Sequence, residues 1–282
     1  MILSRLGGLG VFARTLRIQC PFMTWDRELA LARAAALRAG ELALAHRARG
    51  LDPEAKFDAS PVTAADRECE QLLARLLEEA FPDDGILGEE GARKDSRSGR
   101  RWILDPIDGT RDFVRGNPVW ATLIGLEAGD QPVAGVAHFP DLDETYFAAP
   151  GHGAYRNDNR IQVSSIPAVE QAVLCINGFD VLALQPFAPR LLDWAQTFWA
   201  VRAMGGAFDA MLVASGRAEV WIEPRVKEWD LAAPCIILQE SGARFFTFDG
   251  RRTIYGGNAV ACTPALEPAA HQFFQITKST NH

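Results

Sequence analysis

The chain has 282 residues, of which 48% are hydrophobic and 23% charged, a composition typical of a globular protein with a large core or two sub-domains. Its net charge of -7 argues against general binding to nucleic acids or acidic membranes, because those surfaces attract basic proteins. No apolar run has the length needed to span a bilayer, so we expect neither a nucleic-acid nor a membrane partner.

The cysteines and histidines indicate which kinds of metal site and disulfide the chain can form. The 5 cysteines include no CxxC pair, which favours reduced thiols in a cytoplasmic protein over a disulfide framework or a zinc site. The 5 histidines form no HExxH or other paired motif. Any metal bound here is therefore expected to be a hard cation with oxygen ligands.

The first predicted segment, residues 1–23, is read as a flexible extension. It carries Arg5, Arg14 and Arg17, and no acid occurs before Asp26. A targeting presequence has a similar charge pattern, but the apolar stretch here is short and broken by glycine. Translation assigned upstream of Met23 is the other simple interpretation.

The first half, residues 24–160, begins with two predicted helices. Thr24 is the expected N-cap of a helix over 26–46 that Gly50 ends, and leucines at helical spacing predict a second helix before the turn at 81–85. Short strands at 85–91 and 101–105 and a short helix at 110–116 follow. Three β-rich runs between residues 119 and 149 then predict an antiparallel meander.

The second half, residues 161–282, alternates strands and helices. We expect strands at 172–178, 218–224 and 243–250, and helices at 186–199, 208–216 and 229–242. The pattern predicts a mixed α/β protein in two closely packed halves, divided near residue 160.

The stretch WILDPIDGTRDF, residues 102–113, places Asp105 and Asp108 at the end of a predicted buried strand. An isolated DG would simply be a turn. Here Pro106 stiffens the backbone between the acids, Gly109 allows close approach to a ligand, and Thr110 adds a hydroxyl. Two carboxylates held this close repel each other, so a nearby cation is the natural compensation.

Two other acidic motifs do not fit this stretch. Pro106 and Ile107 break the alternation of ligands that an EF-hand calcium loop requires. Phosphatases with an aspartate nucleophile place an acid two residues before the Asp of DGT, where this chain has Pro106. The sequence therefore argues against a covalent aspartyl-phosphate intermediate.

Together, four segments resemble the inositol monophosphatase superfamily of Mg²⁺-dependent, lithium-sensitive phosphomonoesterases. They are KFDASPVTAAD (56–66), GEE (88–90), the stretch above and EWDLAA (228–233), and the resemblance extends from about residue 26 to residue 262. It implies a layered αβαβα sandwich, a small phosphomonoester as substrate, and a homodimer. The metal site would lie in the first half, with Asp230 and the substrate contacts supplied by the second.

The resemblance also implies roles for individual residues. Two or three Mg²⁺ ions would be held by Glu89, Asp105, Asp108, Asp230 and the carbonyl of Ile107. Glu89 and Thr110, with Asp108, would be catalytic by orienting a metal-bound water for in-line attack, with no phosphoenzyme.

Further residues complete the implied site. The amides of Gly109 and Thr110 would hold phosphate oxygens. Lys56 and Asp66 match an outer, weaker metal site, and Glu90 would support the ligands or face solvent. Asp66 and Asp230 have a second interpretation as acids at the starts of their helices.

The sequence identifies the residues that contact the substrate less specifically than it identifies the metal ligands. The family contacts the leaving alcohol through positions that match Gly205, Gly206, Ala207, Glu223 and Asp230. The segments 113–127 and 223–230 resemble those of bacterial histidinol-phosphate phosphatases, and acids such as Glu223 and Asp209 would suit a cationic amine.

Histidinol phosphate is therefore the expected substrate, and inositol 1-phosphate is its main rival. Fructose 1,6-bisphosphate and 3′-phosphoadenosine 5′-phosphate are further candidate substrates. A hypothesis of a different class is a catalytically silent regulator that binds metal or phosphate on the same fold.

Overall fold

A computed structural model describes residues 25–55 and 61–276 of the chain. The predicted extension at 1–23, the predicted cap Thr24 and the predicted outer-site residue Lys56 lie outside the described residues. None of the helices in the described part is long and apolar enough to cross a membrane.

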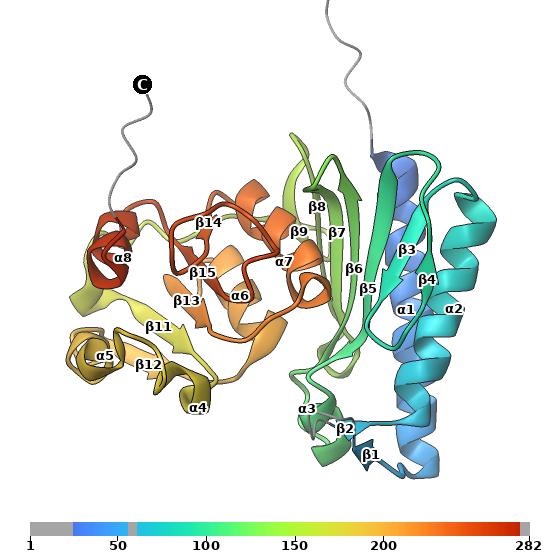
Figure 1. Cartoon of the computed structure of the whole chain (residues 1–282), viewed down its shortest axis with the longest axis horizontal. Coiled ribbons are helices and arrows are strands. Elements are labelled where there is room, and N and C mark those ends of the chain that lie inside the picture. Colours follow the sequence, from blue (N-terminus) through green and yellow to red (C-terminus); the bar gives the residue numbers. More distant parts are fainter. Residues whose placement is uncertain (1–24, 56–60, 277–282) are drawn as a thin grey trace, which may run out of the picture.

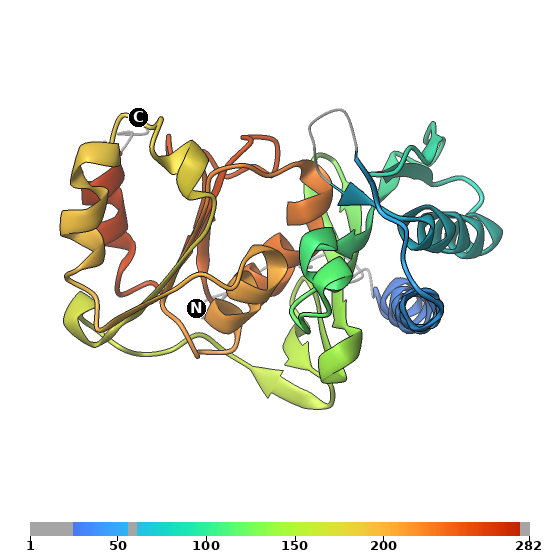
Figure 2. The same ribbon diagram turned by 90° about the horizontal axis from the view of Figure 1, so that it is seen from below.

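The molecule is built in five layers, helix–sheet–helix–sheet–helix (Figures 1 and 2). The first sheet has eight strands, in the order β10 (Asn159–Ile161), β9 (Gly153–Arg156), β8 (Glu144–Ala149), β7 (Gln131–Phe139), β6 (Ala121–Ala128), β5 (Arg100–Asp108), β3 (Gly85–Gly88) and β4 (Arg93–Lys94). The second has five, in the order β12 (Ala200–Arg202), β11 (Val173–Ile176), β13 (Val220–Glu223), β15 (Ala259–Cys262) and β14 (Arg244–Phe246).

Helices cover both faces of each sheet. The outer face of the first sheet carries α1 (Asp26–Arg49) and α2 (Ala64–Ala80), and the layer between the sheets holds α6 (Gly206–Ala214) and α7 (Glu228–Glu240). The far face of the second sheet carries α4 (Phe179–Leu182), α5 (Ala188–Ala195) and α8 (Glu267–Phe274). The short α3 (Thr110–Arg115) follows β5, and β1 (Glu54–Ala55) pairs with β2 (Pro61–Val62). The expected αβαβα fold is confirmed.

Alternation along the strands explains why both sheets are buried on two faces. On β5, Trp102 and Leu104 pack toward α1 and α2, whereas Ile103 packs toward α7. On β13, Trp221 faces the central helices and Ile222 faces the outer ones. Because successive side chains of a strand point to opposite faces, apolar residues at consecutive positions require cover on both sides.

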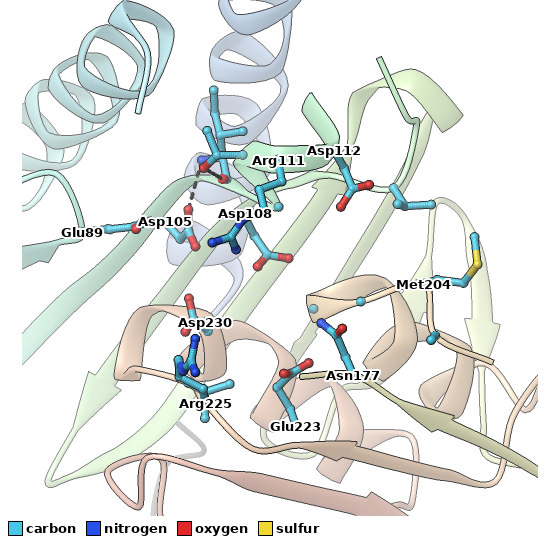
Figure 3. Close-up of a pocket in the computed structure, with 18 residues that line it drawn as sticks. Glu89, Asp105, Asp108, Arg111, Asp112, Asn177, Met204, Glu223, Arg225 and Asp230 are labelled. Carbon is cyan, nitrogen blue, oxygen red and sulfur yellow. Dashed lines mark hydrogen bonds between the residues drawn. The ribbon is translucent and has the colours of Figure 1, made fainter. Parts of the chain in front are cut away.

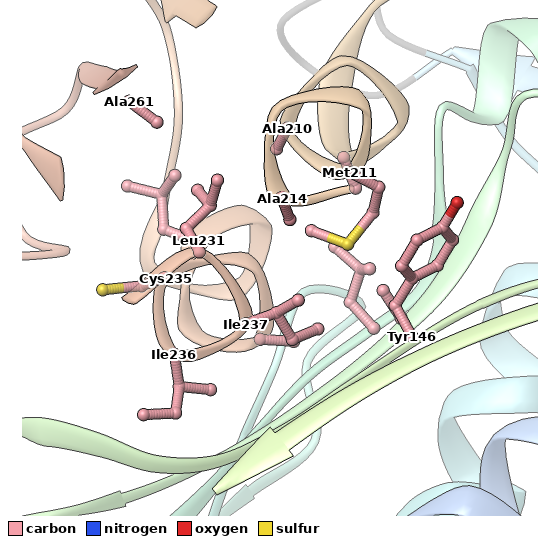
Figure 4. Close-up of a cluster of buried hydrophobic side chains, with 14 of the residues drawn as sticks. Tyr146, Ala210, Met211, Ala214, Leu231, Cys235, Ile236, Ile237 and Ala261 are labelled. Atoms are coloured by element: carbon pink, nitrogen blue, oxygen red, sulfur yellow. The ribbon is translucent and has the colours of Figure 1, made fainter. Parts of the chain in front are cut away.

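The central helix α7 is fixed closely against the first sheet (Figure 4). Its residues from Leu231 to Leu238 are all buried. Gly125 on β6 and Gly135 on β7 permit this approach, since a Cβ at Gly125 would lie 2.5 Å from the Cβ of Ala232. The position of Asp230 at the start of α7 is thereby set by packing against β6 and β7.

Most predicted elements are present, and several short ones were not predicted. The helix expected over 26–46 extends to Arg49, Gly50 follows it as expected, and the meander is formed by β6, β7 and β8. The short strands β4, β9, β10, β12 and β15 and the helix α8 were not predicted. The chain leaves the first sheet at Ile161 and enters the second at Val173, and α6 and α7 pack between the two sheets, so the division near residue 160 stays a prediction.

Candidate metal centre

The centre is formed at the end of β5, where its pairing with β6 becomes irregular. Asp105 pairs with Leu123 and Asp108 with Ala121, and the register shifts between these two pairs. Such an irregularity changes the direction of side chains, so that Asp105 and Asp108, which a regular strand would place on opposite faces, can point to the same side. It is held by a hydrogen bond from the Ile107 amide to Oδ1 of Asp105 at 3.0 Å. Asp105 and Asp108 consequently both line one pocket (Figure 3).

A third carboxylate reaches this point from the second half of the chain. Asp230 lies in the first turn of α7, and the oxygens of Asp105, Asp108 and Asp230 lie within 4.8 Å of one another. The N–H of Lys227 donates to Oδ2 of Asp230 at 2.7 Å, so this acid also begins its helix. The helix-start interpretation of Asp230 is confirmed alongside its place in the acidic cluster.

Burial and neighbouring carboxylates raise the pKa values of all three acids. Burial raises the pKa of Asp105 well above its usual range, and the carboxylates of Glu89, Asp108 and Asp230 raise it further. Removal from water, then the charge of Asp108, raises the pKa of Asp230 to about 8. Removal from water raises the pKa of Asp108 to about 6, against the opposing effect of the Ala207 amide. This set of carboxylates fits a hard divalent cation, which supplies the positive charge that the cluster needs.

Glu89 joins the cluster from the first turn after β3. Its N–H donates to the carbonyl of Leu104 at 3.1 Å, which fixes it beside the residue preceding Asp105. Its side chain lines the same pocket. Glu90, next along the chain, does not line the pocket, and its N–H donates to Glu70.

Thr110 lies at the start of α3 and is linked to both the metal motif and α2. Its Oγ1 lies 3.2 Å from the carbonyl oxygen of Ile107 and 3.4 Å from Oδ1 of Asp66. Asp66 is buried, and its Oδ2 accepts the N–H of Thr63 at 2.8 Å in a capping box that begins α2. The helix-start interpretation of Asp66 is confirmed, and its role in an outer metal site stays a prediction.

The pocket has a volume of about 540 Å³ and opens between the end of β5, the N-terminal turns of α6 and α7, and the end of β13. The predicted site residues that line it are Glu89, Asp105, Ile107, Asp108, Gly109, Thr110, Gly205, Gly206, Glu223 and Asp230. Ala207 does not line it, but its N–H donates to Oδ2 of Asp108 at 2.9 Å.

Glu223 lies across the pocket from Asp105 (Figure 3). The residue is 5% exposed, and Oε2 has no hydrogen-bond partner within the described ranges 25–55 and 61–276. Burial, followed by the charges of Asp108 and Asp230, raises its pKa to about 8, and a hydrogen bond with Asn177 opposes this. An unsatisfied buried carboxylate oxygen at a pocket wall is a strong acceptor for a ligand's N–H or O–H.

The proposed contact of Asp209 with the leaving group is wrong. Asp209 is completely buried and does not line the pocket. Its Oδ2 accepts the N–H of Gly205 at 2.8 Å, four residues earlier, so the carboxylate turns back to the start of α6. It was proposed because an acid near the leaving group would suit a cationic amine, but its carboxylate accepts a hydrogen bond at the N-terminus of α6 instead.

Comparison with known proteins decides the family. The profile of the inositol monophosphatase family matches residues 25–278. The chain belongs to this family. The expected resemblance is therefore confirmed.

Relatives and solved structures agree with this family assignment. A histidinol-phosphatase of Mycobacterium tuberculosis is 40% identical over 245 residues, covering 85% of this chain and 94% of that protein. A histidinol-phosphatase of Chlorobaculum parvum is 40% identical over 240 residues, covering 84% and 92%. The crystal structure of the extragenic suppressor protein suhB from Bartonella henselae superimposes with a TM-score of 0.83 at 28% identity, covering 88% and 98%.

Other residues of this family member line the pocket without having been predicted. Asn177 follows β11, Ala203 follows β12, and Arg225 follows β13. Arg225 pairs with Asp180 of α4 at 2.9 Å, and both side chains are largely exposed. The one signal in the sequence was the position of Arg225 two residues after Glu223.

Proposed function

We propose that this chain is a Mg²⁺-dependent phosphomonoester hydrolase whose substrate is histidinol phosphate. The observation that carries the proposal is the meeting of Asp105, Asp108 and Asp230 in a pocket that Glu223, with its buried and unpaired Oε2, also lines. The histidinol-phosphatases that are 40% identical to this chain support the choice of substrate.

The metal ligands in this proposal are the four acids and one carbonyl expected from the family. Glu89, Asp105, Asp108, Asp230 and the carbonyl of Ile107 would hold two or three Mg²⁺ ions. Bound there, Mg²⁺ supplies positive charge to the phosphate and lowers the pKa of water.

The chain's own groups then position the reactants. The carboxylate of Glu89 accepts a proton from the attacking water, and the hydroxyl of Thr110 orients that water, itself aligned by Asp66 at 3.4 Å. The amides of Gly109 and Thr110 donate to phosphate oxygens at the start of α3. Asp108 is held in place by Ala207. The oxygen of the attacking water bonds to phosphorus as the ester P–O bond breaks, and the leaving alkoxide takes a proton from solvent water.

The leaving group lies between the acids and the far wall, with Gly205 and Gly206 at its side. There the carboxylate of Glu223 forms a charge-assisted hydrogen bond with the ammonium group of histidinol. The ammonium lowers the pKa of Glu223 from about 8, so the pair binds in its charged form. Inositol 1-phosphate is the second candidate, because its hydroxyls can also donate to Glu223.

A comparison of four substrates under the same Mg²⁺ concentration tests the proposal. We expect kcat/KM for histidinol phosphate to exceed that for inositol 1-phosphate, fructose 1,6-bisphosphate and 3′-phosphoadenosine 5′-phosphate by about tenfold or more. A higher value for inositol 1-phosphate would reassign the substrate. Absence of phosphate release from all four would favour the catalytically silent regulator.

Two further properties belong to the proposal. A homodimer is the family's usual assembly. The exposed apolar side chains of Leu192 on α5, Val201 on the edge strand β12 and Trp199 just before that strand support a contact between copies. A light-scattering mass of one chain would contradict it. A reducing, cytoplasmic location is supported by four described cysteines, all buried and free.

A further inference from the structure

A buried carboxylate on α2, that of Glu70, supports the loop that carries Glu89. Its Oε2 accepts the N–H of Glu90 at 2.7 Å and its Oε1 accepts the N–H of Ala92 at 2.6 Å. The residue is only 3% exposed, and α2 stands beside β3 and β4, which this loop connects (Figure 1). We propose that Glu70 is a positioning residue for Glu89, an inference that rests on the role proposed above for Glu89.

Glu70 packs so closely against the loop that position 88 has no room for a side chain. A Cβ at Gly88 would lie 2.2 Å from Oε2 of Glu70, so the carboxylate occupies the volume that any side chain at position 88 would fill. The loop closes on itself through the N–H of Gly88 and the carbonyl of Ala92 at 2.8 Å. Glu89 is therefore held by β5 on one side and by Glu70 on the other.

The chemistry of the contact requires a carboxylate. Two backbone N–H groups point at one side chain, and a carboxylate accepts both, whereas an amide of the same size accepts one and presents N–H groups of its own. Burial raises the pKa of Glu70, the amides of Ala92 and Glu90 lower it, and the charge of Glu89 raises it. A buried acid that is fully hydrogen-bonded to a loop fixes that loop more firmly than apolar packing would.

The helix α2 contacts Thr110 and the loop that carries Glu89, the two residues to which the proposed reaction assigns the water. Asp66 lies four residues before Glu70 and therefore on the same face of α2. Asp66 reaches Thr110, and Glu70 reaches the loop of Glu89. Glu89 follows β3 and Thr110 follows β5, so the two residues come from different parts of the sheet. Contacts with one helix, α2, thus set the distance between them.

The test compares Glu70→Gln with Glu79→Gln, an exposed acid on the same helix. For Glu70→Gln we expect kcat to fall about 10- to 100-fold while KM changes by less than about twofold. The Mg²⁺ concentration for half-maximal thermal stabilisation, measured without substrate, should rise about tenfold. Hydrogen exchange at the amides of Glu90 and Ala92 should accelerate. Glu79→Gln should match the wild type in every measurement.

Wild-type kcat and Mg²⁺ response in Glu70→Gln would overturn the inference. If that variant does not fold, Gly88→Ala supplies the same measurements, because its methyl group displaces the same carboxylate; unchanged kcat and Mg²⁺ response there would also overturn it. A wild-type protein that hydrolyses none of the four phosphomonoesters would refute the proposed function instead. In that case the Mg²⁺-dependent stabilisation of the variants still decides whether Glu70 positions the ligand Glu89.

Discussion

Oδ2 of Asp108 accepts a hydrogen bond from the backbone N–H of Ala207 at 2.9 Å, across 99 residues of sequence. This bond joins the end of β5 in the first sheet to the first turn of α6, which lies between the sheets. Together with Asp230 on α7, it makes the candidate metal centre dependent on the packing of both halves. Substitutions on either side of this junction should therefore affect the same activity.

Gly206→Ala tests this junction directly. Gly206 has φ +48°, and a Cβ there would lie 2.8 Å from Oδ2 of Asp108. We expect kcat/KM to fall about tenfold or more, because a displacement of a ligand by a fraction of an ångström misaligns the reacting groups. The control is Gly129→Ala, which has φ +58° but nothing within 4 Å of its Cβ. Equal activity of the two variants would contradict the expected clash.

Asp105→Asn should abolish Mg²⁺-dependent turnover and leave the fold intact. The amide is neutral, so the repulsion that raises the pKa of Asp105 disappears, and the metal-free protein should be at least as stable as the wild type. We expect a loss of activity of about a thousandfold or more, with an unchanged or higher Tm in EDTA. Asp130→Asn, in the turn between β6 and β7, is the control, since asparagine tolerates its φ of 58°. Retained turnover in Asp105→Asn would refute its assignment as a ligand.

The stability of the metal-free protein should fall as pH rises. The pKa values of Asp230 and Glu223, about 8, and of Asp108, about 6, lie above their ordinary values of 3.8, 4.5 and 3.8. The folded protein therefore binds these protons more tightly than the unfolded chain does. Their contribution to stability is fully present below about pH 4 and is lost as pH rises through 6 to 8.

Thermal unfolding in EDTA and in Mg²⁺, at pH 5.5 and pH 8, measures this effect. Mg²⁺ needs ionised ligands, so the Tm increase that it causes should be larger at pH 8 than at pH 5.5. Groups away from the metal centre titrate in the same way in EDTA and in Mg²⁺. Their effect on Tm therefore cancels when the Tm in EDTA is subtracted from the Tm in Mg²⁺ at each pH. A stabilisation by Mg²⁺ that is independent of pH, or larger at pH 5.5, would not agree with the raised pKa values.

Glu223→Gln should separate the two leading substrates. The substitution removes the charge that pairs with the ammonium of histidinol but keeps an oxygen that can accept from a hydroxyl. We expect kcat/KM for histidinol phosphate to fall by about tenfold or more, and that for inositol 1-phosphate to fall less. Equal losses for the two substrates would show that Glu223 does not select for the amine.

Lithium should inhibit the enzyme at millimolar concentration or below, as membership of the family implies. Li⁺ is a small, hard cation that accepts the same carboxylate and carbonyl oxygens as Mg²⁺. Potassium at equal concentration serves as the control for ionic strength. Full activity in high lithium would separate this chain from the lithium-sensitive members of the family.

Local sequence was enough to predict the parts of the site that a short segment builds. Asp105, Ile107, Asp108 and Thr110 lie within six residues, and Asp230 is marked by the helix that it begins. The strand and helix pattern predicted a mixed α/β protein in two halves, and the layered fold was expected from the resemblance to the inositol monophosphatase superfamily. The ligand roles could be expected because the segments that carry this resemblance are short and continuous in the sequence.

The remaining parts of the site depend on tertiary packing. Asn177, Ala203 and Arg225 reach the pocket from loops without a motif, and only the packing of both sheets against α6 and α7 brings these loops to the acids. Asp209 was misassigned because an acid near the leaving group would suit a cationic amine, and the sequence could not show that its carboxylate turns to the Gly205 amide. Strand β15, four residues long, is too short for its periodicity to be recognised.

Anomalous diffraction from crystals grown with Mn²⁺, a hard cation that takes the same oxygen ligands as Mg²⁺, tests the central claim most directly. We predict at least one strong anomalous peak within coordination distance of carboxylate oxygens from both Asp105 and Asp230, with Asp108 or Glu89 completing the shell. A protein that is active with Mn²⁺ in solution but shows no peak among these residues, or shows its peak elsewhere, would contradict the assignment of this metal centre.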